Sequence, residues 1–291
     1  MLNHTKNPTT ITVGQSTATC ILATKGYKDH NIYTMELVYP RYIHSELMTH
    51  RMFSRNASSS RATPITVNIS EVQNDPVFFD YVGINQSGMV AGEPLDIVNL
   101  ELFKKEWNDL GYWVATRVKD MSDKYHIHKQ TLNRALEPWS RIRTLVTATE
   151  WDNFFNLRLA EGAQPEIRSL AQAIQQSMEL AELKQRTFHV PYVDEITEND
   201  FKETTMLCTR NNNKLSVLDK FLISAARCAR VSYGRLDARP TNNEEDIKLA
   251  MRLYENGHMS PFEHIIQTEL YDCSFYNLRG ACSLRYVLEQ L

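Results

Sequence analysis

"HRMFSRNASSSRA", residues 50–62, concentrates hydrogen-bond donors in one short stretch of the chain. It holds one histidine, three arginines, one asparagine and four serines, and its only large apolar side chains are Met52 and Phe53. Successive backbone N–H groups, short hydroxyls and a guanidinium can together surround a phosphate. A polar turn at the end of a helix accounts for the same residues, so this stretch alone leaves both interpretations open.

The residues before this stretch predict a strand and then a helix. "NIYTMELVYP", residues 31–40, is rich in β-branched and aromatic residues and ends at a proline, which is typical of a strand. A helix is expected from Tyr42 to about Phe53. On that helix Glu46, His50 and Ser54 share a face, and the serine run forms the turn at its end.

Three further helices are predicted from apolar spacing and capping residues. The first spans residues 95–121, where apolar side chains recur three or four positions apart and form a core stripe: Phe103, Trp107, Leu110, Val114, Val118 and Met121. The second begins at Pro165 and carries Ile167, Leu170, Ala171, Ile174 and Met178 on one face. The third, within residues 242–257, has an asparagine cap and a terminal glycine.

The remaining segments show no boundary or repeat. Residues 83–94, "GINQSGMVAGEP", are expected to form an ordered loop or a mobile lid. Residues 188–213 are polar and are interpreted as a surface connection without a clear domain boundary. The chain, residues 1–291, is therefore expected to form a single domain.

Composition bounds the class of protein. The chain has 291 residues, of which 42% are hydrophobic, so it can bury a sizeable core. Its net charge of −3 gives no global electrostatic reason to bind nucleic acid or an anionic membrane. No apolar run approaches the length of a transmembrane helix, and the polar N-terminus lacks a secretory segment. A cytoplasmic location is expected.

Motifs for metals and common nucleotide folds are absent from the sequence. The five cysteines are scattered without a C-x-x-C pair, so they are interpreted as reduced, mostly buried thiols. The "HIH" at residues 126–128 has no partnered carboxylate pattern and is interpreted as a solvated helix face, so no metal is expected. Neither G-x-G-x-x-G nor G-x-x-x-x-G-K-[ST] occurs, which makes a Rossmann or P-loop enzyme improbable.

Residues 49–61 resemble the signature of the flavin-dependent thymidylate synthases, R-H-R-x-x-S-x-N-E-x-S-x-R. Six of the eight specified positions match: His50, Arg51, Ser54, Asn56, Ser59 and Arg61. Thr49 stands in place of arginine and Ala57 in place of glutamate. Residues 153–168 resemble the family's later N-L-R and A-Q-x-E-I-R segment, with Thr147 and Thr149 where the family usually has asparagine and arginine.

Two further family segments occur in an unusual order. A-R-V-S-[FY]-G and H-x-[ST]-P-F-E-H, which normally lie near the N-terminus, appear here at residues 229–234 and 258–264. The chain therefore resembles a circularly permuted member, a rearrangement that is feasible when termini lie close together at the surface. The resemblance implies an α+β fold, with one helix-rich domain around a central, mostly antiparallel sheet.

The resemblance implies reductive methylation of dUMP to dTMP. Methylenetetrahydrofolate would supply the carbon, reduced FAD the hydride, and NADPH the reducing equivalents for the flavin, so that no protein nucleophile is needed. The matched segments contain only Cys228, without an adjacent histidine to activate it. The family also implies a homotetramer whose sites are shared between subunits.

The resemblance assigns roles to individual residues. Arg158 and Ser59 are implied to be catalytic, with Arg158 at the pyrimidine edge, where its charge would stabilise an anionic ring. The phosphate would be held by Ser59, Ser60, Arg61 and Arg134. The residues implied to contact FAD are His50, Arg51, Asn153, Ser232 and His264.

Simpler interpretations stay open for these residues. A surface ion pair or cap accounts for the phosphate set, a helix-end arginine for Arg158, and a buried, hydrogen-bonded histidine for His264. Glu46 stands where the family commonly has glutamine near the substrate; a carboxylate accepts from an amino group, so cytosine becomes conceivable. Together with Ala57, this leaves dCMP methylation, hydroxymethyl transfer or a non-catalytic nucleotide-binding homologue as alternatives.

Overall fold

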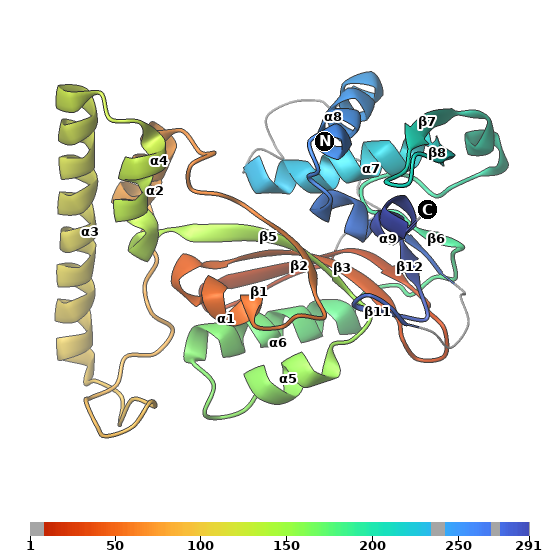
Figure 1. Ribbon diagram of the computed structural model, residues 1–291. Coiled ribbons are helices and arrows are strands. Elements are labelled where there is room, and N and C mark those ends of the chain that lie inside the picture. The colour runs from red at the N-terminus through yellow and green to blue at the C-terminus, as the bar shows by residue number, and fades with distance from the viewer. Residues whose placement is uncertain (1–8, 234–241, 269–273, 291) are drawn as a thin grey trace.

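A five-stranded antiparallel sheet forms the centre of the molecule (Figure 1). The computed structural model describes residues 9–233, 242–268 and 274–290. The strand order is β1-β2-β3-β5-β4, and the strands are β1 Thr9–Val13, β2 Ser16–Thr24, β3 Ile32–Pro40, β4 Ser54–Ala57 and β5 Arg141–Ala148. The strand predicted at residues 31–40 and the α+β class are confirmed.

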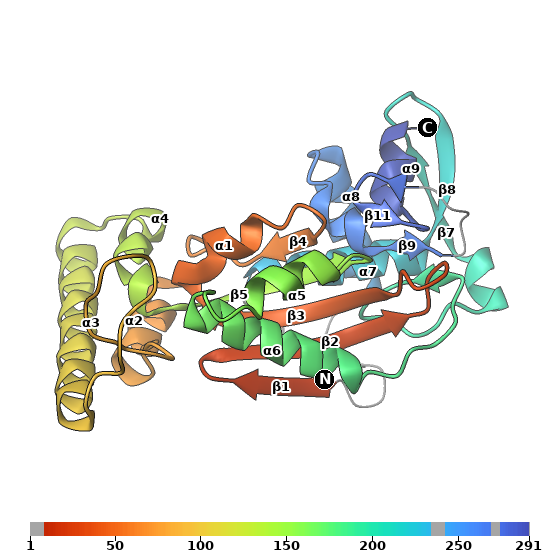
Figure 2. The same cartoon turned by 90° about the horizontal axis from the view of Figure 1, so that it is seen from below.

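Alternate residues of β5 divide between the two faces of the sheet. Ile142, Val146 and Ala148 enter the core that α6, Pro165–Glu179, covers. Figure 2 shows α6 and α5, Asp152–Arg158, lying along this face. The helix predicted from Pro165 is confirmed, and its buried residues include Ile167, Leu170, Ala171 and Ile174.

The C-terminal part of the chain covers the opposite face. Its helices are α7 Asp219–Arg230, α8 Asn243–Glu255 and α9 Leu284–Gln290, with 3₁₀ turns η4 Val231–Tyr233 and η5 Ser260–His264. Asn242 caps α8 by accepting a hydrogen bond from the Glu244 backbone N–H, and Gly257 follows the helix with φ +73°. The third predicted helix is thereby confirmed, with the asparagine cap and the terminal glycine where the sequence places them.

A second helical group lies beside the sheet. It contains α2 Ile65–Asn74, α3 Ile97–Tyr125, α4 Lys129–Leu132 and the 3₁₀ turn η2 Asn133–Trp139. The helix predicted at residues 95–121 is confirmed as α3, which packs on α2 and η2. Gly111 permits that approach, since a Cβ there would lie 2.8 Å from Trp139. No helix of the described residues has the length and hydropathy of a membrane span.

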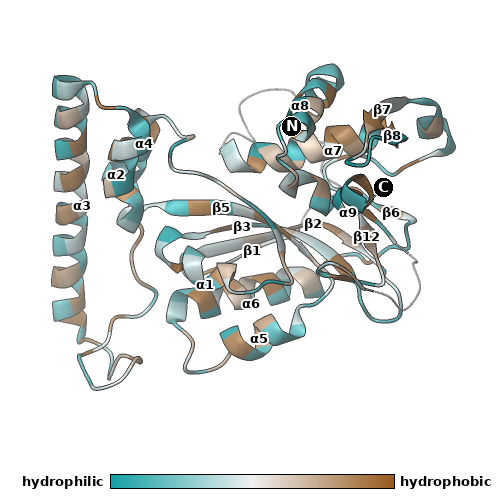
Figure 3. Cartoon of the chain, viewed as in Figure 1, coloured by the Kyte–Doolittle hydropathy of each residue, from teal (hydrophilic) through white to brown (hydrophobic). Residues whose placement is uncertain are grey.

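The stripe predicted on α3 is only partly buried. Val118 is fully buried, whereas Leu110 is 48% exposed. The opposite side of the helix also leaves apolar side chains in contact with solvent, including Val98, Leu102 and Trp113. Figure 3 shows hydrophobic positions distributed along the whole of α3. The prediction that this stripe is core was therefore wrong in part, because α3 has protein on one side only.

The helix expected at residues 42–53 ends earlier than predicted. The chain forms a 3₁₀ turn η1, Arg41–Ile43, and then α1, His44–Met48. Ser54 belongs to β4, which pairs with β5, so Ser54 shares no helix face with Glu46 and the serine run follows a strand. The Arg55 guanidinium donates to the carbonyls of Met48 and His50, which satisfies the end of the helix. Residues 54–57 therefore form a strand and not a helix, because they pair with β5, which is distant in the sequence.

Residues 188–213 are more ordered than a simple surface connection. They contain β6 Phe188–His189, the 3₁₀ turn η3 Glu198–Lys202 and β7 Thr204–Cys208, which forms a hairpin with β8 Lys214–Leu218. β6 joins β9 Ile266–Gln267 and β12 Cys282–Ser283 in a small sheet, and β10 Ser274–Phe275 pairs with β11 Leu278–Arg279. Residues 83–94 form a loop. Backbone hydrogen bonds close its base, from the Ile84 N–H to the Glu93 carbonyl and from the Leu95 N–H to the Val82 carbonyl.

The histidine and cysteine interpretations have mixed outcomes. His126 ends α3 in the left-handed region and His128 caps α4, so the pair flanks a turn and does not lie within a helix. Cys20, Cys228 and Cys282 are buried thiols, whereas Cys208 is exposed. Cys273 and Gly234 lie outside the described residues.

Candidate functional site

Arg158, the last residue of α5, is fixed by three partners from the chain around α1. Its Nη1 donates to Glu46 Oε2 at 3.0 Å, its Nε to His50 Nε2 at 2.9 Å and its Nη2 to Thr49 Oγ1 at 3.1 Å. The side chain of Arg158 is 18% exposed, so the guanidinium is partly removed from water. We call Arg158, Glu46, His50 and Thr49 the Arg158 cluster.

The geometry of the Arg158 cluster fixes the protonation state of His50. A guanidinium only donates, so Nε2 of His50 accepts and the ring proton is on Nδ1. Burial, together with the positive charges of Arg158 and Arg55, lowers the pKa of His50 to about 4. The His50 ring also packs edge-on against Phe154, at 4.9 Å between centroids. A neutral imidazole, packed against Phe154, therefore orients the Arg158 guanidinium.

A chain of buried hydrogen bonds crosses the opposite face of the sheet. His264 Nδ1 lies 2.8 Å from Thr147 Oγ1, which lies 2.7 Å from Thr34 Oγ1. Thr34 Oγ1 is 2.7 Å from His189 Nε2, and His189 Nδ1 is 2.9 Å from Thr24 Oγ1. All five side chains are fully buried. We call this series the Thr–His chain.

The two histidines of the Thr–His chain are neutral. Burial lowers the pKa of His264 to about 3, and burial with the charge of Arg186 lowers the pKa of His189 to about 3. The hydroxyls of Thr34 and Thr147 each have two partners and can both donate and accept, so the inner members are satisfied. Nε2 of His264 is the exception, since it is buried without a partner in the described part of the chain.

The C-terminal segments reach the serine run directly. The Ser59 N–H donates to the carbonyl of Ser232 at 3.2 Å. The Asn277 side-chain amide donates to Ser54 Oγ at 3.0 Å and to the carbonyl of Met52 at 2.9 Å. Residues far apart in sequence therefore meet at β4, the edge strand of the sheet.

A polar cavity of about 280 Å³ lies beyond the end of β4. Ser60 and Asn133 line it together with three arginines, Arg41, Arg141 and Arg143. Ser60 and Asn133 are buried, and the Asn133 amide donates to the carbonyls of Ser60 and Thr63, which holds the serine run against η2. We call this cavity the Arg41 pocket.

The structure brings only part of the predicted residue set together. Glu46, His50 and Arg158 are in direct contact, Ser59 contacts Ser232, and His264 reaches β5 through Thr147. Ser60 is buried in the Arg41 pocket, whereas Arg51, Arg61, Arg134 and Asn153 are all exposed. Arg134 pairs with Glu137 at 2.9 Å and is 61% exposed. Within one chain these four residues form no common site.

Several residues of these sites were not found from the sequence. Thr34 and His189 carry no local motif, and Thr147 was recognised only as a departure from the family pattern. Arg41 and Asn133 likewise gave no signal, because their relation to Ser60 depends on strand pairing and on the packing of η2. In the described residues no group of three or more His, Cys, Asp or Glu side chains has the arrangement of a metal site.

Two unpartnered atoms bear on the predicted flavin contacts. His264 Nε2 and Asn56 Nδ2 are both buried without a hydrogen-bond partner in the described residues, and η5 packs against β4. Buried polar atoms are rarely left unpaired in a folded protein. A polar group of a bound molecule would satisfy them, and both atoms lie in segments that the resemblance assigns to the flavin site.

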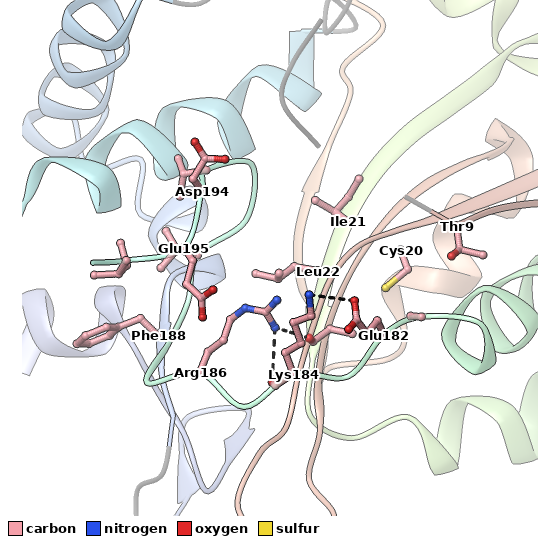
Figure 4. Close-up of a pocket in the computed structure, with 15 residues that line it drawn as sticks. Thr9, Cys20, Ile21, Leu22, Glu182, Lys184, Arg186, Phe188, Asp194 and Glu195 are labelled. Carbon is pink, nitrogen blue, oxygen red and sulfur yellow. Dashed lines mark hydrogen bonds and ion pairs between the residues drawn. The ribbon is translucent and has the colours of Figure 1, made fainter. Parts of the chain in front are cut away.

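A second cavity, of about 300 Å³, contains none of the predicted site residues (Figure 4). It lies between β2 and the segment from Ala181 to Ile196. Arg186 lines it and donates to the carbonyl of Ala23 at 2.9 Å, and Lys184 pairs with Glu182 at 2.9 Å. Arg186, Lys184 and Glu182 are therefore already engaged within the protein.

Comparison with known proteins identifies the family. Among solved structures, the chain is similar to thymidylate synthase X from Helicobacter pylori with FAD and dUMP, at 19% identity and a TM-score of 0.35, over 51% of this chain and 68% of that one. It is also similar to the UMP/dUMP methylase PolB from Streptomyces cacaoi bound with 5-Br dUMP, at 16% identity and a TM-score of 0.42, over 52% and 67%. No curated protein sequence matches the chain. The family model described as "Thymidylate synthase complementing protein" matches residues 25–181, more than half of the chain. The chain thus belongs to this family, that of the flavin-dependent thymidylate synthases.

Proposed function

We propose that this protein catalyses the reductive methylation of dUMP to dTMP, with methylenetetrahydrofolate as carbon donor, FAD as cofactor and NADPH as reductant. The observation that carries the proposal is the Arg158 cluster. It holds a fixed cation beside the family's signature segment, through a neutral histidine and a carboxylate. A preorganised positive charge stabilises negative charge that develops on a pyrimidine ring.

The remaining site residues take the roles that the family resemblance implies. Ser59, Ser60, Arg61 and Arg134 hold the phosphate. His50, Arg51, Asn153, Ser232 and His264 hold FAD, which supplies the hydride when it is bound and reduced. The chain does not need a cysteine nucleophile for this chemistry. Burial raises the pKa of the Cys228 thiol well above its usual range, so this cysteine stays protonated.

The chain is also proposed to be circularly permuted. Residues 229–233 and 258–264 lie outside the part matched by the family model, yet they pack on β4 and β5, which lie inside it. The bond from Ser59 N to the Ser232 carbonyl and the contact between Thr147 and His264 are the points of attachment. In other family members these two segments lie near the N-terminus. Here they would reach the same sheet from the C-terminal part of the chain.

A homotetramer with shared sites is proposed for the assembly. Arg51, Arg61 and Asn153 are exposed and would face a neighbouring copy. The apolar side chains exposed on α3 give this assembly a surface to bury. Light scattering coupled to gel filtration measures the assembly directly, and a monomer that turns over substrate would contradict shared sites.

The function is tested by incubating the purified protein with FAD, NADPH, methylenetetrahydrofolate and dUMP. The expected results are a nucleotide product with the mass of dTMP and NADPH oxidation that dUMP stimulates. Flavin and nucleotide binding without any product would support a non-catalytic homologue instead. Omission of each reactant in turn shows which of them the reaction requires.

A cytosine substrate, or hydroxymethyl transfer, is the second candidate. Glu46 Oε2 accepts from Arg158 at 3.0 Å, which places a carboxylate in the Arg158 cluster, and Ala57 removes the carboxylate of the family pattern. Parallel incubations with dUMP and dCMP, followed by product mass, distinguish these outcomes. Glu46→Gln is the matched variant: if Glu46 selects cytosine, this change shifts turnover toward dUMP.

A further inference from the structure

The Arg41 pocket contains an unusual concentration of unpaired buried atoms. Arg41 Nε, Ser60 Oγ and Asn133 Oδ1 are buried without a hydrogen-bond partner in the described residues, and all three side chains line this one cavity. The cavity of Figure 4 has no such atom among its lining residues. Unpaired buried donors and acceptors destabilise a protein, so their convergence on one space requires an explanation.

Arg41 differs from the two other arginines of the pocket. Arg141 pairs with Asp75 at 2.8 Å and Arg143 pairs with Glu36 at 3.0 Å. The Arg41 guanidinium forms no ion pair with a carboxylate in the described part of the chain, and its pKa is lowered, mainly by burial. Glu71 and Glu137 interact with its charge from a distance, but neither forms an ion pair with it among the described residues. A partly desolvated guanidinium without a close ion pair is the kind of group that binds an oxyanion.

The orientation of Asn133 is fixed by chemistry. Its Nδ2 faces two carbonyl oxygens, Ser60 O at 2.7 Å and Thr63 O at 3.1 Å, and only an amide N–H₂ can bond both. Oδ1 is therefore the free atom, and it accepts. The pocket thus offers donors from Arg41 and Ser60 and an acceptor from Asn133.

Two carboxylates of the pocket are paired with arginines. Glu137 is neutralised by Arg134 at 2.9 Å, and Asp75 by Arg141. Glu71 accepts from the backbone N–H of Arg141 at 3.3 Å. The volume of about 280 Å³ is at the lower end of ligand cavities, so it is large enough for a phosphate with part of a sugar.

We propose that the Arg41 pocket binds the phosphate and a hydroxyl of a sugar phosphate. Arg41 and Ser60 donate to the phosphate oxygens, and Asn133 Oδ1 accepts from the hydroxyl. Arg41 and Asn133 are then ligand residues outside the signature segment that suggested a phosphate site. The identification of the ligand as dUMP rests on the proposed function, whereas the binding of phosphate does not.

The test is isothermal titration of the full chain with inorganic phosphate, dUMP and deoxyuridine. Arg41→Gln should weaken binding of phosphate and dUMP about tenfold or more, because it removes a charged donor. Deoxyuridine lacks the phosphate, and its affinity should not change. The matched control is Arg117→Gln, which alters an exposed arginine of α3 that pairs with Asp120. Ser60→Ala, which removes one donor and no charge, should weaken phosphate less than Arg41→Gln.

The outcomes separate this proposal from the proposed function. If Arg41→Gln folds, as judged by circular dichroism, and binds phosphate and dUMP as the wild type does, the pocket is filled by water only and the proposal is wrong. If phosphate binding depends on Arg41 but the wild type forms no methylated nucleotide, the pocket stands and the proposed function fails. If Arg41→Gln forms dTMP with an unchanged KM for dUMP, the proposed function stands and the pocket proposal fails.

Discussion

The two ends of β5 differ in how they satisfy their buried polar groups. Arg141, Arg143 and Thr147 share one face of this strand. At the Thr147 end, five fully buried side chains bond one another in the Thr–His chain. At the Arg141 end, the Arg41 pocket leaves three buried atoms without partners in the described residues.

The two ends therefore contain two kinds of buried polar group: those that bond one another and stabilise the fold, and those that are left unpaired and that we propose bind a ligand. A fully connected network stabilises one packing of the sheet, whereas unpaired groups carry a desolvation cost that a bound molecule removes. His264 Nε2 is an exception at the Thr147 end, because it too is buried without a partner in the described residues. The Arg158 cluster is intermediate, because its guanidinium is bonded by the protein yet remains 18% exposed.

The largest expected effect is acid unfolding driven by the neutral histidines. The pKa values of His50, His189 and His264 lie at about 4, 3 and 3 in the fold, below the value near 6.5 of the unfolded chain. The unfolded state therefore binds more protons, and stability is complete above pH 6.5 and falls as the pH drops toward 4. At pH 5 each histidine costs about 2 kcal/mol, and together they approach the stability of a typical domain.

The measurement is the urea midpoint of unfolding, followed by circular dichroism between pH 7.5 and 5. A midpoint that stays constant over this range would show that these histidines are not held neutral by burial. The loss should persist in high salt, since desolvation is its largest cause and ions do not screen desolvation.

The next effect concerns Arg158, the paired counterpart of Arg41. Arg158→Ala should lower kcat/KM for dUMP about 100-fold, because it removes the charge proposed to face the pyrimidine. Steady-state kinetics measure this loss. Arg168→Ala is the matched control, since Arg168 is an arginine of α6 whose guanidinium donates to the backbone carbonyl of Glu161 and is assigned no role in the reaction. Equal activities of the two variants would remove Arg158 from the site.

Breaking the connected end of β5 should cost stability. Thr147→Val keeps the shape but leaves Thr34 and His264 without their shared hydroxyl, so the free energy of unfolding should fall by about 1–3 kcal/mol. Urea denaturation measures the change. Thr147→Ser, which retains the hydroxyl, should lose clearly less. If valine and serine behave alike, the hydrogen bonds do not stabilise this end of the strand.

The smallest expected effect on stability is that of Arg134. Its pair with Glu137 is exposed, so Arg134→Ala should change the free energy of unfolding by about 0.5 kcal/mol or less. The dUMP affinity of the same variant tests whether Arg134 belongs to the phosphate site. If Arg134 holds phosphate, as the family resemblance implies, dUMP affinity falls while stability does not; if affinity is also unchanged, the phosphate site does not include this residue.

Local sequence patterns were sufficient for elements whose determinants lie close together in the chain. β3, α6 and α8 follow from alternation, helical spacing and capping residues within each segment. The end of α1 did not follow, because β4 is created by pairing with β5, almost ninety residues later in the sequence. The α3 stripe was overestimated for a related reason: spacing shows that a face is apolar but not what covers it.

The sequence by itself determined the family, through the signature at residues 49–61 and the match over residues 25–181. It also marked Glu46, His50 and Arg158 as candidate site residues. Only the tertiary structure decided that these three touch one another, that Thr147 bonds His264, and that Ser60 shares a pocket with Arg41. Short-range patterns set secondary structure, but hydrogen bonds between distant segments depend on strand register and packing, which no single stretch of sequence contains.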